Sequence, residues 1–116
     1  ENNLAILKIA LEIEQINFKY QDAKTNLHSE IAATSAQLDA LVEIIKLHKE
    51  NINIAAEQAT AENKRFNLSY GDISLVIQAR DQELAAKLQY IQSLVTFKKT
   101  YQAILSMCDK FLPISN

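Results

Sequence analysis

Glycine and proline are almost missing from this chain. Its 116 residues include one glycine, Gly71, and one proline, Pro113, where average usage would give about a dozen of the two together. All-β and α/β folds need many turns, which these residues commonly supply. Their scarcity excludes such folds and predicts an all-α chain of a few long helices.

Residues suited to metal or catalytic chemistry are also scarce. Cys108 is the single cysteine, so an internal disulfide is excluded. His28 and His48 would stand roughly 30 Å apart on one helix, too far to share a metal. We expect no metal site, no cofactor and no catalytic residues, and therefore no enzyme. His48 is expected to be partly buried with its polar atoms satisfied.

Charge and hydropathy limit the partners. The net charge is −2, whereas nucleic-acid binding requires a concentrated basic surface, so nucleic acid is not expected as a partner. No apolar run reaches the length of a membrane span. The chain begins at Glu1 without methionine, from which we expect a segment of a longer protein.

The pattern that is present is a heptad repeat, with apolar residues spaced alternately three and four positions apart. This spacing keeps one row of residues, here called a seam, facing a partner helix. In the first half it runs through Leu27, Ile31, Thr34, Leu38, Leu41, Ile45, His48, Ile52, Ala55, Ala59, Glu62 and Phe66. A similar row precedes it at Ile6, Ile9, Ile13, Ile16, Tyr20 and Ala23. We predict one uninterrupted helix over about 2–66.

A turn is predicted at 67–72, followed by a second helix over about 73–112. Gly71 is expected to supply a positive φ, Asp72 to cap the second helix, and Pro113 to end it. The seam predicted for this helix is Ile73, Ile77, Arg80, Leu84, Lys87, Ile91, Leu94, Lys98, Tyr101, Leu105, Cys108 and Leu112. A second stripe is expected on another face, at Val76, Ala79, Ala86, Tyr90, Phe97, Ile104, Met107 and Phe111. Residues 1–116 thus form one domain, an antiparallel coiled-coil hairpin.

Two features predict additional helical neighbours. Each helix carries a second apolar face, which a two-helix hairpin alone does not bury. The second helix is also shorter, and folded back it reaches only about residue 30, leaving the apolar residues of 4–20 without a partner. We therefore expect packing with further helices in an oligomeric bundle or α-barrel.

The segment from Ala59 to Tyr101 resembles the second helical hairpin of the TolC-like outer-membrane efflux family. The motifs that carry the resemblance are an Arg-aromatic pair, a short glycine-containing turn and an apolar run that closes on Ala-Arg. They correspond to Arg65-Phe66, to Ser69 through Asp72, and to Ala79-Arg80. Ser69 departs from the family pattern, in which glycine is commoner at that position. Asp72 is the only charge at the turn, which puts a gate built from acid–base pairs in doubt.

The resemblance implies a periplasmic tunnel segment of an outer-membrane export channel in a Gram-negative bacterium. It implies a homo-oligomer, trimeric in the parent protein, that works with a periplasmic adaptor and an inner-membrane transporter, as in type I secretion. The membrane would be crossed only by β-strands absent from this chain. The residues implied for adaptor docking are those of the turn: Leu68, Ser69, Tyr70, Gly71, Asp72 and Ile73.

Two other functions stay open at this point. An adaptor-type or scaffolding coiled coil would share the hairpin without a role in transport. Adaptors, however, flank theirs with β-rich halves that this sequence lacks. A cytosolic structural bundle that dimerises through residues 4–27 is the other alternative.

Overall fold

The computed structural model describes the backbone of residues 2–115 and the side chains of residues 2–112. These residues form two α-helices and no strand: α1 spans Asn2–Asn67 and α2 spans Ile73–Ser115. The predicted all-α class and antiparallel hairpin are confirmed. The chain divides into two units: Gln37–Tyr101, the hairpin unit, and Glu1–Ala36 with Gln102–Asn116, the terminal unit.

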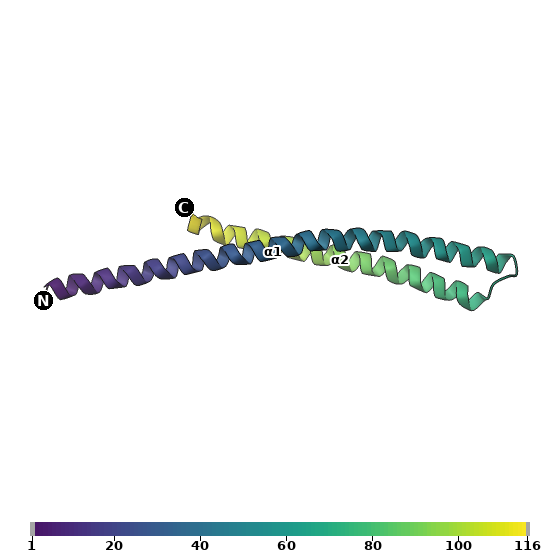
Figure 1. Cartoon of the computed structure of the whole chain (residues 1–116), viewed down its shortest axis with the longest axis horizontal. Coiled ribbons are helices and arrows are strands. Elements are labelled where there is room, and N and C mark those ends of the chain that lie inside the picture. Colours follow the sequence, from purple (N-terminus) through teal and green to yellow (C-terminus); the bar gives the residue numbers. More distant parts are fainter. Residues whose placement is uncertain (1, 116) are drawn as a thin grey trace. The chain divides into compact units, whose positions relative to one another are not determined.

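In the hairpin unit, α1 and α2 run side by side on either side of the turn (Figure 1). The most buried apolar residues in this unit are small. They are Ala55 and Ala59 on α1, and Val76, Ala79 and Ala86 on α2. Ala59 is fully buried, with 0% of its surface exposed. Small side chains at the contact let two helix backbones approach closely, so this seam is narrow.

The seam predicted for α1 is confirmed. From Leu27 to Glu62 every residue of the predicted row is buried or half-buried, whereas Phe66, at the end of the row, is exposed. The heptad spacing identified this face because nearly all its residues are apolar or small.

The seam predicted for α2 is wrong, because most of its residues are exposed and the second stripe is buried instead. Apart from Cys108 of the predicted seam, which is half-buried, the buried and half-buried residues follow the second stripe, with Glu83, Ser93 and Thr100 filling its gaps. These polar residues are accommodated by bonds within α2. The Ser93 hydroxyl donates to the carbonyl of Tyr90 at 2.7 Å, and the Thr100 hydroxyl donates to that of Thr96 at 2.9 Å. Counting large apolar residues therefore selected the wrong face of this helix.

In the terminal unit, the end of α2 lies beside the middle of α1. The rings of His28 and Phe111 meet edge to face with centroids 4.5 Å apart, and the Thr34 hydroxyl lies 3.7 Å from the sulfur of Met107. Residues 2–23 of α1 are all exposed. The exposed large apolar side chains of this part include Leu4, Ile6, Leu7, Ile9, Leu11, Ile13, Ile16 and Phe18. The predicted mismatch in helix length is confirmed.

Pro113 does not end α2, contrary to the prediction, since the helix continues to Ser115. Proline removes one backbone hydrogen bond to the preceding turn. Because Pro113 lies in the last turn, few backbone hydrogen bonds follow the missing one, and the helix continues for two further residues. None of the described helices is long and apolar enough to cross a membrane.

Candidate docking tip and its flanking surfaces

The end of the hairpin, residues 68–73 (the tip), comprises the turn after α1 and the first residue of α2. It begins with a C-cap on α1. The N–H of Tyr70 donates to the carbonyl of Arg65 at 2.9 Å, and the N–H of Ser69 donates to that of Phe66, also at 2.9 Å. These two bonds form the Schellman arrangement, which places the intervening residue in the left-handed region. That residue is Ser69, with φ of 65°.

Gly71 does not have a positive φ, so the prediction for this residue is wrong. The left-handed position lies two residues earlier, at Ser69. Gly71 is instead required for space. A Cβ added there would lie 3.1 Å from the backbone nitrogen of Phe66 and 3.3 Å from the carbonyl carbon of Arg65. The turn folds so closely onto the end of α1 that it leaves little room for a side chain.

Asp72 caps α2, as predicted. Its Oδ1 accepts the backbone N–H of Ser74 at 3.0 Å, and its carbonyl accepts the N–H of Leu75 at 3.1 Å. The hydrogen bond from the Ser74 backbone, supported by the Ser74 hydroxyl, holds the pKa of Asp72 below its ordinary value. The charged side chain of the tip, Asp72, therefore stabilises the first turn of α2.

The tip exposes apolar side chains. Tyr70 is 78% exposed, Leu68 is 57% exposed and Ile73 is 49% exposed. They lie on consecutive parts of a turn that is held by its own backbone hydrogen bonds. Leu68, Tyr70 and Ile73 thus give the end of the hairpin an exposed apolar surface.

A groove of about 270 Å³ lies between the helices near the tip. Its lining residues are Gln58, Ala61, Glu62, Leu75, Gln78, Ala79 and Gln82. Glu62 Oε1 lies 3.6 Å from Arg65 Nη1, while its Oε2 is buried with no hydrogen-bond partner among the described residues. The heptad pattern did not predict this groove, because in that pattern Glu62 is only one further position of the α1 seam.

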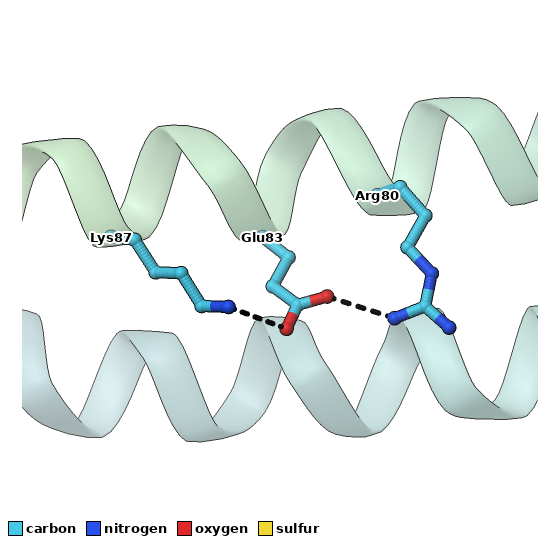
Figure 2. Close-up of polar contacts among 3 residues, drawn as sticks. All are labelled: Arg80, Glu83 and Lys87. Atoms are coloured by element: carbon cyan, nitrogen blue, oxygen red, sulfur yellow. Dashed lines mark hydrogen bonds and ion pairs between the residues drawn. The ribbon is translucent and has the colours of Figure 1, made fainter.

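Farther from the tip, Glu83 joins two basic residues of α2 (Figure 2). Its carboxylate accepts from Arg80 Nη1 at 3.0 Å and lies 3.4 Å from Lys87 Nζ. In Figure 2 all three side chains point from α2 toward α1, and only 14% of the Glu83 side chain is exposed. The hydrogen bond from Arg80, with help from Lys87, holds the pKa of Glu83 below its usual value despite desolvation.

The residues of the sequence signature are placed as follows. Arg65 and Phe66 supply the two carbonyls of the cap, Ala79 is buried in the seam beside the groove, and Arg80 bonds to Glu83. Arg65 and Phe66 thus adjoin the tip, whereas Ala79 and Arg80 belong to the contact between the helices.

His48 and Cys108 are residues of types that bind metals or react as nucleophiles. His48 is half-buried on the seam, as predicted, but its buried Nδ1 has no hydrogen-bond partner among the described residues, so the expectation of full satisfaction is wrong. Cys108 is a half-buried free thiol. Within the described part of the chain, no group of three or more His, Cys, Asp or Glu residues could hold a metal ion.

Comparison with known proteins gives no match. No family model, no curated protein and no solved structure matches this chain.

Proposed function

We propose that this chain is a periplasmic tunnel segment of an outer-membrane export channel, and that its tip docks a periplasmic adaptor. The observation that carries the proposal is the exposed apolar surface of Leu68, Tyr70 and Ile73 on a tightly closed turn. Contiguous exposed apolar surface is a feature of protein–protein contacts.

The construction of the tip supports docking of another helical hairpin. Gly71 carries no side chain and lies close to the backbone of Phe66 and Arg65, and the turn is closed by its own backbone hydrogen bonds. A preformed surface loses little conformational entropy on binding. Asp72 is already engaged by Ser74, so apolar contact rather than ion pairing would supply most of the affinity.

The second apolar face of each helix supports a place in a wall of helices. Ile54 on α1 and Leu84 on α2 are among the exposed apolar residues outside the seam. A helix that touches a neighbour on each side needs two such faces. In the proposed channel, a homo-oligomer of the parent protein would cover these faces, and the adaptor would connect the tip to an inner-membrane transporter.

The proposal is tested by changing the tip in the full-length protein in its own cells. The double variant Leu68→Ser/Tyr70→Ser should weaken adaptor binding at least about tenfold, because apolar side chains at a contact centre dominate affinity. Leu88→Ser is a matched control, since Leu88 is as exposed as Leu68 but lies away from the tip. The readout is recovery of the periplasmic adaptor with the purified channel, together with export.

Equal recovery of the adaptor with the tip variant and with the control would contradict docking at the tip. A crosslinker placed at residue 68 that yields only cytosolic partners would favour an interaction module without a role in transport.

A further inference from the structure

The groove near the tip, here called the tip groove, combines polar side chains from both helices with an apolar floor. Gln58 on α1 and Gln78 and Gln82 on α2 are exposed and carry the amide groups that line it. The buried Ala79 forms part of the floor. Leu75, another lining residue, lies in the first turn of α2. The groove therefore opens beside the tip.

Glu62 is the only charged residue among those that line the tip groove. It occupies a position of the α1 seam, where only 25% of its side chain is exposed. Its Oε1 lies 3.6 Å from Arg65 Nη1, too far for a hydrogen bond, and its buried Oε2 has no hydrogen-bond partner among the described residues. A buried carboxylate oxygen lowers stability unless a donor reaches it. The tip groove thus holds an acceptor for which the described part of the chain supplies no donor.

The size of the tip groove suits a small group. Its volume of about 270 Å³ lies below the roughly 300–1,000 Å³ of pockets that hold drug-sized ligands. Ala79 lines the groove from the helix opposite Glu62, and its methyl group fills little of the space between them. Ala61 and Leu75 add apolar contact surface. A short alkyl chain that ends in one planar polar group fits this combination.

A guanidinium group matches the chemistry of these lining residues. The Glu62 carboxylate and the amide oxygens of the three glutamines accept hydrogen bonds, and guanidinium presents five N–H donors and no acceptor. Its positive charge complements Glu62, and charge-assisted hydrogen bonds are about twice as strong as neutral ones. Guanidinium is also more weakly hydrated than ammonium, so it enters a partly apolar groove more readily.

We propose that the tip groove binds one guanidinium group, which donates to the buried Oε2 of Glu62 and to the glutamine amides beside it. The site goes beyond the proposed channel function and does not depend on it. Two sources share this chemistry: an arginine side chain of a protein bound at the tip, and a free small guanidinium compound.

Titration of the 116-residue chain with butylguanidine tests the site, with the side-chain amide signals of the glutamines followed by nuclear magnetic resonance. Saturable shifts of Gln58, Gln78 and Gln82 are expected, because these amides line the groove. Butylamine, which has the same alkyl chain, should bind several-fold more weakly because ammonium is more strongly hydrated. No saturable shift, as for a groove that holds only water, or equal binding of butylamine would overturn the proposal.

Two matched substitutions test the role of the Glu62 carboxylate. Glu62→Gln should weaken butylguanidine binding at least about tenfold, because it removes a charge-assisted hydrogen bond. Glu57→Gln is the control, since it removes the same charge from an exposed position outside the groove. Circular dichroism checks that both variants stay helical. Equal affinity of the two variants would contradict the proposal.

Arg65→Gln tests the same carboxylate in the opposite direction. The Arg65 side chain is 59% exposed and pairs with Glu62 Oε1, so it competes with an incoming cation. Its removal should strengthen butylguanidine binding roughly twofold to fivefold, as expected for the loss of a surface ion pair. Weaker binding by this variant would show that the ligand does not engage the Glu62 carboxylate and would contradict the site.

The source of the guanidinium group is decided with the full-length protein in its own cells, and this arm alone rests on the proposed function. Weaker recovery of the periplasmic adaptor with Glu62→Gln than with Glu57→Gln would assign the group to an arginine of that adaptor. Equal recovery, with butylguanidine binding lost in Glu62→Gln, would assign it to a free small compound. A parent protein that recovers no adaptor would contradict the proposed function, whereas the titration would still decide the site.

Discussion

Ser69 holds a left-handed backbone, with φ of 65°, at the position where a Schellman cap usually has glycine. A residue with a Cβ loses about 1–2 kcal/mol of stability in this region, a cost that glycine does not have. Part of glycine's advantage is offset, because glycine loses more conformational entropy on folding. Ser69→Gly should therefore stabilise the hairpin by about 0.5–1 kcal/mol. Urea unfolding followed by circular dichroism measures the change, and Ser69→Ala, which keeps a Cβ, should show no gain.

Gly71 is constrained by space rather than by φ. A Cβ at this position would press on the backbone nitrogen of Phe66, and helical backbone cannot move aside cheaply. We expect Gly71→Ala to destabilise the hairpin by about 1 kcal/mol, because overpacking outweighs the entropy gained by removing glycine. Unchanged or increased stability in the same unfolding assay would show that the turn can open to admit a side chain.

Asp72 should make stability depend on pH in acid. Its folded-state pKa is lowered from the ordinary 3.8 by the bonds from Ser74. The stabilisation is therefore fully present above pH 3.8 and is lost as the pH falls through the lower folded value. Asp72→Asn caps the helix without titrating, so its stability should fall less than that of the parent chain below that pH. Parallel curves for the two proteins in acid unfolding would contradict this role.

At the scale of the elements, the contact between α1 and α2 depends on small residues. Ala86 is buried in the seam, whereas its neighbour Ala85 is exposed. Ala86→Leu should cost about 1–3 kcal/mol by forcing the helices apart, while Ala85→Leu should change stability by less than about 0.5 kcal/mol. Equal effects in thermal unfolding would mean that the helices are not closely packed at this level.

Both helices, the turn and the seam of α1 could be predicted from the sequence, because scarce breakers and regular heptads are local signals. The seam of α2 could not. Its polar members, Glu83, Ser93 and Thr100, are satisfied by bonds within α2, which spacing alone does not reveal. Asp72 was identified as a cap from residue type alone. The left-handed Ser69 and the crowding at Gly71 depend on how the turn folds against α1.

At the scale of the whole molecule, most large apolar residues lie outside the seams. In the terminal unit, exposed residues such as Leu4, Ile9 and Phe18 occupy several faces of α1. In the hairpin unit, residues of the second apolar faces, such as Ile54 and Leu84, and the tip are exposed in the same way. Apolar surface on this scale is typical of a chain that is completed by further helices. The proposed wall of hairpins with a docking tip would account for these surfaces together.

The most direct test of this account is the location and size of the protein in its source cells. An antibody against the hairpin should detect, in the outer-membrane fraction, a protein larger than the 13.1 kDa of this chain. That result is expected if the hairpin is the periplasmic part of an export channel. A band of 13.1 kDa in the cytosolic fraction would contradict the channel and leave a self-associating helical hairpin.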